Sequence, residues 1–119
     1  MRKVEKPWGY EEIWAETDTY VGKILTILPG HRLSLKYHEK KEETIYVLEG
    51  TLKLWESESE NDYRFLNKGA VYHVKPGQIH RFGCHDHEDS QMSRPHLKLL
   101  EVSTPELNDV VRIVDDYKR

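Results

Sequence analysis

Three residues of types that bind metal ions are spaced along the first two-thirds of the chain. His38 and Glu43 lie within residues 29–50, PGHRLSLKYHEKKEETIYVLEG, and His80 follows about forty residues after His38. Imidazole and carboxylate groups bind Zn, Mn, Fe, Co or Ni, and three protein ligands leave open positions on the ion for a substrate. A metal site and a set of hydrogen-bonded polar residues without a metal are both compatible with these residue types.

Two cations precede the first histidine at positions that alternate with leucine. Because the side chains of a strand point alternately to its two faces, the polar and apolar residues here would separate. One face would carry Arg32, Ser34, Lys36 and His38, and the other Leu33, Leu35 and Tyr37. We expect the polar row to line the lumen of a barrel. The leucines would then be covered by an outer strand or a second subunit, and we predict a homodimer.

Arg32 and Lys36 are the candidate substrate-binding cations of this row. Both side chains would face the lumen of the expected barrel, where cations favour an anionic ligand. An alternative of equal weight is a buried ion-pair network of both cations with Glu43. The sequence leaves these two arrangements open.

The elements that would position these residues are short strands. Segments rich in Val, Ile, Leu, Tyr and Thr are separated by turn residues, which predicts an antiparallel all-β domain. The expected strands are 20–28, 32–38, 44–49, 51–56, 71–74, 80–84 and 97–102. Strands of this number and spacing are typical of a sandwich or a small barrel, and a barrel removes exposed sheet edges.

Length and charge restrict the function classes. A chain of 119 residues is expected to form one domain, and a net charge of −3 gives no general attraction to nucleic acid or acidic membranes. There is no apolar run long enough for a signal peptide or a membrane span. Cys84 is the only cysteine, so no intrachain disulfide can form. We expect a soluble cytoplasmic protein.

The two metal-bearing segments resemble the two motifs of the cupin superfamily. The first motif is similar at Gly30, His38, Glu43 and Gly50, and the second at Gly69, Pro76, Gly77 and His80, with the proline one place later than usual. The resemblance implies a double-stranded β-helix (cupin) barrel over residues 1–119. It also implies a divalent transition metal in the lumen, bound by His38, Glu43 and His80.

Three further blocks narrow the resemblance and extend it across nearly the whole chain. EKPWG at 5–9, RLSL at 32–35 and VVRIVDDYKR at 110–119 are similar to type II mannose-6-phosphate isomerase domains. Such domains occur alone or fused behind a sugar-1-phosphate guanylyltransferase, and this chain resembles the standalone form. The resemblance implies that the chain interconverts mannose 6-phosphate and fructose 6-phosphate in carbohydrate metabolism. This proton transfer needs an electrophile and a base, and the catalytic candidates among the lumen residues are Lys36 as electrophile and Glu43 as base, with Glu43 the weaker candidate if it binds the metal.

Lys36 departs from the family pattern, which has a first metal-binding histidine or glutamine at this position. At an effective dielectric near 20, an ammonium about 4 Å from a divalent ion costs about 8 kcal/mol, whereas deprotonating a lysine at neutral pH costs about 4.6 kcal/mol. Three outcomes stay open: Lys36 binds the metal as a neutral amine, pairs with Glu43, or replaces the metal's charge. We expect metal affinity that rises with pH and improves in Lys36→Gln.

The sequence also leaves alternatives for the site and the function. Cys84, His85, His87 and His96 form a rival zinc candidate around a polar loop, although such a cluster is more often solvated surface. The main functional alternative to an isomerase is a non-catalytic cupin that binds a sugar or another small anion, with its metal weakened or lost because of Lys36. A metal-dependent oxygenase is a third reading, since fold alone does not determine function.

Overall fold

The computed structural model describes residues 1–85, 96–106 and 108–117, and over these residues the chain forms β-strands and turns without a helix. The strands are β1 (Arg2–Lys6), β2 (Gly9–Glu16), β3 (Val21–Ile27), β4 (Leu35–Tyr37), β5 (Glu43–Glu49), β6 (Leu52–Trp55), β7 (Tyr63–Leu66), β8 (Val71–Val74), β9 (Arg81–Cys84), β10 (Leu97–Ser103) and β11 (Val111–Val114). Among the described residues, no helix has the length and apolar character that a membrane span needs.

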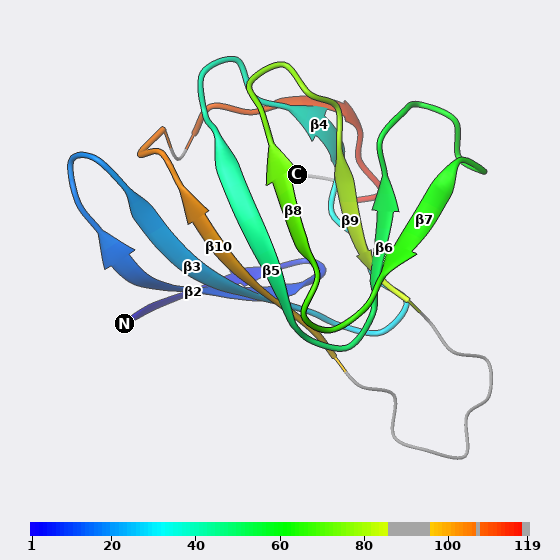
Figure 1. The fold of residues 1–119 in the computed structure, drawn as a ribbon, viewed down its shortest axis with the longest axis horizontal. Helices are drawn as coiled ribbons and strands as arrows, with labels where there is room; N and C mark the ends of the chain where they lie inside the picture. The colour runs from blue at the N-terminus through cyan, green and yellow to red at the C-terminus, as the bar shows by residue number, and fades with distance from the viewer. Residues whose placement is uncertain (86–95, 107, 118–119) are drawn as a thin grey trace.

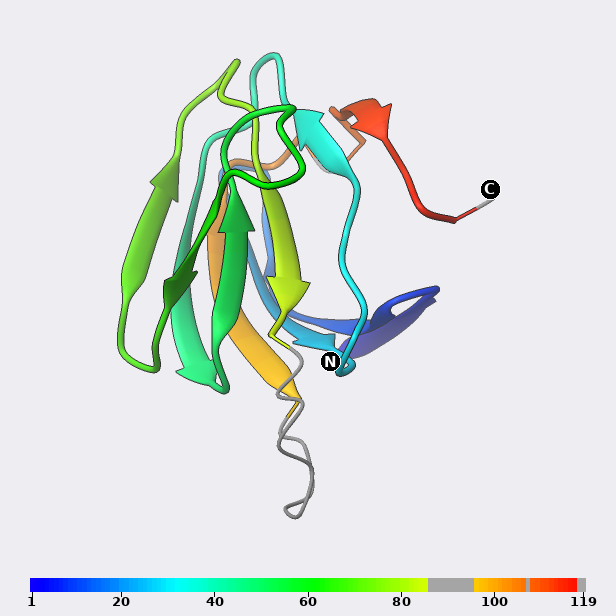
Figure 2. The same cartoon turned by 90° about the vertical axis from the view of Figure 1, so that its right-hand side faces the viewer.

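The strands form three antiparallel sheets that enclose a common interior (Figures 1 and 2). The large sheet has the order β1-β2-β3-β10-β5-β8, a smaller one has the order β7-β6-β9, and β4 pairs with β11. The all-β double-stranded β-helix predicted from the sequence is confirmed. Strands that are neighbours in the large sheet can be far apart in the sequence, since β10 lies between β3 and β5.

The interior is apolar at one end and charged at the other. At the apolar end, inward-facing residues of the two larger sheets are fully buried, and they include Ile45, Val47, Leu52, Leu54, Leu97 and Leu99. Further along the same inner face of the large sheet, the buried side chains are Glu11, Lys23, Glu43 and Glu101. Burying charged side chains is unfavourable unless they are paired, so the charged end of the lumen is a candidate functional site.

The predicted strands agree with the structure in the middle of the chain. The segments predicted at 20–28, 44–49, 51–56, 71–74, 80–84 and 97–102 match β3, β5, β6, β8, β9 and β10 within two residues at each end. Four strands were not predicted, namely β1, β2, β7 and β11. β1, β7 and β11 are largely exposed or lie at a sheet edge, so they lack the apolar alternation that marks a buried strand. β2 lies inside the large sheet, but its alternation includes the charged residues Glu11 and Glu12.

The segment predicted as one strand at 32–38 is shorter and irregular. Only Leu35–Tyr37 form β4, while Arg32 makes an isolated bridge to Gly83. Leu33 and Leu35 are both buried inside the described chain itself, and Leu33 belongs to the main core. The leucines therefore need no second subunit to cover them, and the reason given for a homodimer is wrong.

Two glycines of the cupin-like motifs make turns that join the site's segments. Gly50, between β5 and β6, has a φ of 77°, and a Cβ there would lie 2.8 Å from the carbonyl oxygen of His96. Gly77 has a φ of 80°, and its N–H donates to the carbonyl of His38 over 2.6 Å. Left-handed backbone favours glycine at both positions. The hydrogen bond from Gly77 to His38 joins the turn before β9 to the segment that carries His38.

Candidate metal centre

His38 lies directly after β4, and its imidazole is held in one orientation. Its Nδ1 donates to the backbone carbonyl of Asp109 over 2.5 Å, so Nε2 is the nitrogen left to face the lumen. This Nε2 is buried and has no hydrogen-bond partner among the described residues. Burial lowers the pKa of His38, although the bond to Asp109 opposes this. The imidazole is therefore neutral at neutral pH, which is the form that binds a metal.

His80 lies just before β9 and is oriented in the same way. Its Nδ1 donates to the backbone carbonyl of Gln78 over 3.0 Å, and its main chain bridges to Lys36. The side chain is fully buried, and its Nε2 lacks a hydrogen-bond partner among the described residues. A histidine whose Nδ1 bonds a backbone carbonyl while its buried Nε2 has no hydrogen-bond partner has the arrangement seen in metal ligands.

Glu43, the first residue of β5, supplies a carboxylate between the two imidazoles. Its Oε1 lies 3.4 Å from His80 Nε2, and its Oε2 lies 4.0 Å from His38 Nε2. Lys41 Nζ is 3.1 Å from Oε2. Burial alone would raise the pKa of Glu43, but His80 and Lys41 hold it well below its usual range. The carboxylate is therefore ionised at any physiological pH.

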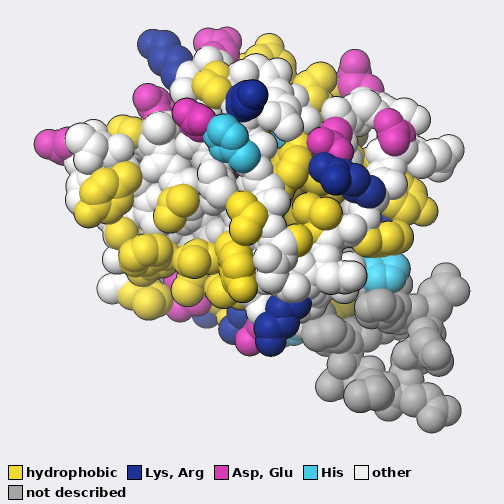
Figure 3. All heavy atoms as spheres, in the orientation of Figure 1, with side chains coloured by type: hydrophobic (Ala, Val, Ile, Leu, Met, Phe, Trp, Pro, Cys, Tyr) yellow, Lys and Arg dark blue, Asp and Glu magenta, His cyan; other side chains and the backbone are white. Residues whose placement is uncertain are grey.

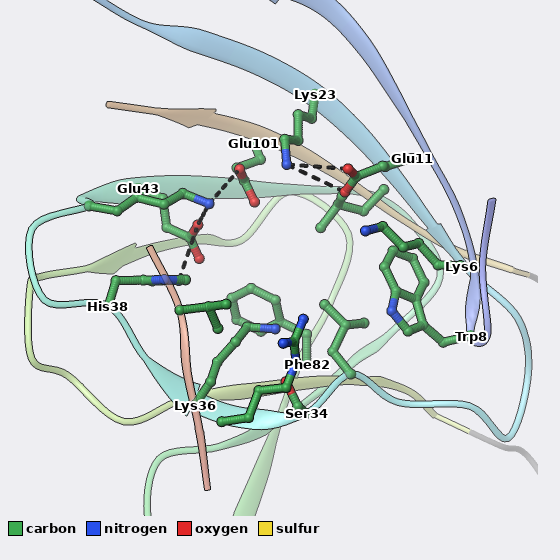
Figure 4. Close-up of a pocket in the computed structure, with 15 residues that line it drawn as sticks. Lys6, Trp8, Glu11, Lys23, Ser34, Lys36, His38, Glu43, Phe82 and Glu101 are labelled. Atoms are coloured by element: carbon green, nitrogen blue, oxygen red, sulfur yellow. Dashed lines mark hydrogen bonds and ion pairs between the residues drawn. The ribbon is translucent and has the colours of Figure 1, made fainter. Parts of the chain in front are cut away.

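These three side chains meet the requirements of a metal site. One ligand atom from each of His38, Glu43 and His80 lies within 4.8 Å of the other two, and in the part of the chain that the structure describes this is the group that could hold an ion. Figure 4 shows His38 and Glu43 pointing toward one another at one side of the hollow. Two buried nitrogens without partners beside an ionised carboxylate are costly unless a cation binds there. The residues thus fit a divalent transition metal.

Lys36 points into the same hollow, as Figure 4 shows. Burial lowers the pKa of its ammonium to about 8, with Lys41 adding to the effect and Glu43 opposing it. Among the described residues, the ammonium within ion-pair distance of Glu43 is that of Lys41. A pairing of Lys36 with Glu43 is therefore not the arrangement found. At pH 7 a lysine with a pKa near 8 loses its proton at a cost of only about 1.4 kcal/mol.

Acidic and basic side chains alternate in a row across the inner face of the large sheet, and the row ends at the candidate metal ligand Glu43. Lys23 Nζ lies 3.4 Å from both carboxylate oxygens of Glu11, and Lys41 Nζ lies 3.4 Å from Glu101. Glu101 on β10 is the register partner of Lys23 on β3. Burial and the neighbouring Glu43 raise the pKa of Glu101 to about 7, against the opposing effect of Lys41. Figure 4 shows this row along one wall of the hollow.

Sequence reasoning missed these four charged residues, although a signal was present. In β3 and β10 the charged residues Lys23 and Glu101 alternate with apolar neighbours such as Ile24 and Leu100. In such a strand either the charged or the apolar side chains face the interior, and the alternation alone does not say which. Only the register across several strands shows that the charges face the lumen.

The hollow carries more positive than negative side chains. Its volume is about 100 Å³, and its charged lining consists of Lys6, Lys23, Lys36, Lys41 and Arg112 with Glu11, Glu43 and Glu101. Arg112 on β11 is the register partner of Lys36 on β4, so these two cations are neighbours. This excess of positive charge favours an anionic ligand.

Arg32 does not lie where the sequence analysis expected it. It lines a different hollow, with Trp55, Tyr63 and Gly83, and its guanidinium bonds Glu60 and Asp116 at 2.6 Å each. The expected placement beside Lys36 is wrong, because residues 33 and 34 are not in a strand and the two-residue alternation is interrupted there. The alternative, an ion pair of Arg32 with Glu43, is not found either, since Arg32 pairs with Glu60 and Asp116.

Asp109 is a supporting residue that the sequence did not reveal. Its carboxylate accepts three bonds from the backbone N–H groups of Glu39, Lys40 and Lys41, over 3.1, 2.7 and 2.9 Å, while its carbonyl accepts from His38. These N–H groups hold the pKa of Asp109 below its usual range. One residue thus orients a metal ligand and fastens the loop that leads to Glu43.

The rival metal site receives little support from the described residues. Cys84 is buried and belongs to the hydrophobic core, with its Sγ 3.7 Å from the carbonyl oxygen of His85. His87 lies outside the described residues. Arg81, next to His80, is buried and donates to the carbonyls of Leu33 and Val114, as expected for a structural role.

The fold agrees with what comparison with known proteins shows. Residues 23–94 match the family described as Cupin domain, and the chain belongs to this family. The structure is similar to the polyketide cyclase RemF from Streptomyces resistomycificus, with a TM-score of 0.73, 19% identity, and 88% of this chain and 70% of that one covered. At this identity the likeness shows the fold alone.

Two curated relatives are similar over nearly the whole chain. Mannose-1-phosphate guanylyltransferase of Escherichia coli (strain K12) is 31% identical over 121 residues, which cover 99% of this chain and 23% of the relative. Xanthan biosynthesis protein XanB of Xanthomonas campestris pv. campestris is 28% identical over 127 residues, with 99% and 24% covered. The chain thus spans about a quarter of the length of these relatives.

Proposed function

We propose that this cupin is a sugar-phosphate isomerase that interconverts mannose 6-phosphate and fructose 6-phosphate, with a divalent transition metal held by His38, Glu43 and His80. The observation that carries the proposal is the pair of buried Nε2 atoms, without partners among the described residues, beside an ionised carboxylate. The similarity to proteins of mannose-phosphate and xanthan metabolism supports the substrate class. When bound, the metal would polarise the carbonyl and hydroxyl oxygens at C1 and C2 of the sugar.

Lys36 and Arg112 form the cationic binding site for the phosphate in this proposal. They are neighbours across the β4–β11 pair, both line the hollow, and they take the place of the pair of Arg32 and Lys36 that the sequence suggested. A phosphate between an ammonium and a guanidinium receives charge-assisted hydrogen bonds from both. The charge of the phosphate would also raise the proton affinity of Lys36, so substrate binding and metal binding would act on this lysine in opposite directions.

Isomerisation moves a proton between C2 and C1, which requires a general base that is not bound to the metal. Glu43 is poorly suited to this step, because coordination and its low pKa reduce its basicity. Glu101 lines the same hollow and has a pKa near 7, which suits a group that accepts a proton from C2 and returns it to C1. Glu43 therefore acts in the proposal as a metal ligand, and Glu101 carries the proton.

A second candidate function is a non-catalytic cupin that binds a sugar phosphate or another small anion. The specific observation in its favour is Lys36, which places a cation at the edge of the metal site while the hollow keeps its positive charge. This protein would bind mannose 6-phosphate without converting it.

A coupled assay separates the two candidates. The purified protein, stripped with chelator and then supplied with Mn²⁺, Zn²⁺ or Co²⁺, is incubated with mannose 6-phosphate, and fructose 6-phosphate is measured. We expect turnover with at least one metal and loss of turnover in Glu101→Gln. Binding of mannose 6-phosphate by calorimetry without turnover under any metal would support the binder, and absence of both binding and turnover would overturn both candidates.

A further inference from the structure

The outer face of the small sheet carries aromatic and basic side chains side by side. On β6, Leu54 belongs to the core, so its neighbours Lys53 and Trp55 point to the opposite, outer face. Their register partners on the edge strand β7 are Phe65 and Tyr63. Figure 3 shows hydrophobic, basic and acidic side chains interspersed at the side of the molecule where β7 lies in Figure 1.

These side chains line a cleft that is separate from the lumen. Its volume is about 370 Å³, against about 100 Å³ for the lumen hollow, and no described residue lines both. Figure 2 shows the small sheet facing the viewer, beside the segment that leads to β4. Pockets that bind small molecules typically have volumes of about 300–1,000 Å³. The cleft therefore has room for a small organic ligand.

The aromatic rings form a buried floor and an exposed wall of this cleft. Trp55 is only 4% exposed, whereas Tyr63 and Phe65 are 43% and 45% exposed. At Gly83 on β9, a Cβ would lie 3.0 Å from both Arg32 Cβ and Trp55 Cζ3, so glycine allows these two side chains to pack closely. The C–H groups on one face of a pyranose ring pack well on the negative face of an aromatic ring. Tyr63 and Phe65 thus offer an apolar wall to a sugar ring.

Lys53 places a positive charge over this wall. Its Nζ lies 4.0 Å from the ring centroid of Tyr63 and 4.9 Å from that of Trp55. Cation–π attraction holds the ammonium in place but does not neutralise it. No carboxylate of the described residues forms an ion pair with Lys53. The ammonium is therefore positioned to bind an anionic group of a ligand.

Glu60 supplies a fixed hydrogen-bond acceptor at the same cleft. Its Oε1 lies 2.6 Å from Arg32 Nη1, its Oε2 lies 3.8 Å from Arg81 Nη1, and its side chain is still 64% exposed. The remaining lone pairs of the carboxylate can accept from hydroxyl groups. Both arginines also lie within 4 Å of Asp116, so two guanidiniums and two carboxylates balance and Lys53 adds one positive charge. This balance favours a ligand with a single negative charge over a polyanion.

We infer that the cleft on the outer face of the small sheet binds a sugar that carries one carboxylate. The sugar ring packs against Tyr63 and Phe65, its hydroxyl groups donate to Glu60, and its carboxylate accepts from Lys53. The inference does not depend on the proposed isomerase function, because the residues of the lumen take no part in it.

The three tryptophans report the place of binding in an NMR titration of the full chain. Trp55 lines the cleft, Trp8 lines the lumen hollow, and Trp14 lines neither. The indole N–H of Trp55 donates to the carbonyl of Glu60, so a ligand at Glu60 should shift its signal. We expect glucuronate to shift the signal of Trp55 and to leave those of Trp8 and Trp14 in place. Glucose, which lacks the carboxylate, should bind about tenfold more weakly or worse.

Substitutions test the two halves of the cleft separately. Lys53→Gln should weaken the binding of glucuronate about tenfold or more and leave that of glucose unchanged. Tyr63→Ala should weaken the binding of both sugars. Its control is Tyr20→Ala, which removes a tyrosine that is 54% exposed and lies outside the cleft, and which should bind both sugars like wild type.

Several results would overturn the inference. They are an unshifted Trp55 signal at glucuronate concentrations up to about 50 mM, equal affinities for glucose and glucuronate, and unchanged affinity for glucuronate in Lys53→Gln. A shift of Trp8 alone would assign glucuronate to the lumen and would equally contradict a site on the small sheet. Mannose 6-phosphate tests the proposed function through the signal of Trp8, so failure of one proposal is distinguishable from failure of the other.

Discussion

The imidazole rings of His38 and His80 lie with their centroids 5.1 Å apart, and both turn a buried Nε2 toward the carboxylate of Glu43. They reach this position from different motifs, one after β4 and the other before β9. In each ring Nδ1 is already occupied by a backbone carbonyl. The backbone thus selects the same tautomer in both histidines, and this preorganises the site before any ion binds.

Asp109→Ala should weaken metal binding although Asp109 does not touch the ion. The change removes the acceptor for three backbone N–H groups of the 39–41 loop, which allows the loop and the His38 ring to move. Residues that support metal ligands typically contribute about 10–100-fold in affinity. Calorimetric titration with Zn²⁺ measures this, with Asp62→Ala on the exposed 56–62 turn as control. Unchanged affinity in Asp109→Ala would show that the loop is held by other contacts.

Lys36→Gln should tighten metal binding at pH 7 by about tenfold, because a lysine of pKa about 8 is roughly nine-tenths protonated there. The difference should nearly vanish at pH 9, where wild-type Lys36 is mostly neutral. The metal affinity of the wild type should therefore rise as the pH increases past 8, whereas the metal affinity of Lys36→Gln should not. Metal titrations at both pH values measure the effect.

Lys53→Gln, outside the lumen, is the control for this measurement. A variant that binds metal more weakly than wild type at pH 9 would instead show that Lys36 is itself a ligand as the neutral amine. Equal affinities of Lys36→Gln and wild type at pH 7 would remove Lys36 from the metal site.

Glu101→Gln should change the pH dependence of folding stability in the metal-free protein. A carboxyl whose pKa rises from 4.5 in the unfolded chain to about 7 in the fold binds its proton more strongly when folded. Its contribution to stability is complete below pH 4.5 and is lost as pH rises to about 7, by about 3 kcal/mol at most. Urea unfolding should thus show Glu101→Gln gaining on wild type between pH 5 and pH 8, whereas the exposed control Glu58→Gln does not.

The opposite trend would contradict the assigned pKa of Glu101. If Glu101→Gln loses stability relative to wild type as pH rises, the carboxylate is favoured as the ionised partner of Lys41. It would then have a structural role and would not be the group that carries the proton.

Arg32→Ala and Arg112→Ala separate the two cation positions. Arg32 fastens the C-terminal segment through Asp116, so its loss should lower the melting temperature but leave the affinity for mannose 6-phosphate within about twofold. Loss of Arg112, which lines the hollow, should weaken that affinity about tenfold or more. Calorimetry measures both. A large loss of affinity in Arg32→Ala alone would return Arg32 to the substrate site.

The sequence predicted the fold because strand and turn residues follow one another along the chain, and because the two cupin-like motifs are visible in it. The structure brings together His38, Glu43 and His80, the three residues for which the resemblance implied a metal site. Arg32 could not be placed, because the strand alternation is interrupted at residues 33–34 and Arg32 lines a different hollow from Lys36. Asp109 and Glu101 acquire their roles from partners about 60 to 70 residues away, which only the fold brings near.

Metal binding by wild type and His80→Ala is the measurement that tests the proposed centre most directly. His80 is fully buried, and its Nε2 has Glu43 as its neighbour in the lumen, so its loss leaves two of the three ligands. After removal of metal with chelator and titration with Zn²⁺ or Mn²⁺, wild type should bind one ion per chain, and folded His80→Ala should bind at least about a hundredfold more weakly. Equal binding by the two proteins, or no binding by wild type at pH 9, would contradict a metal centre at His38, Glu43 and His80.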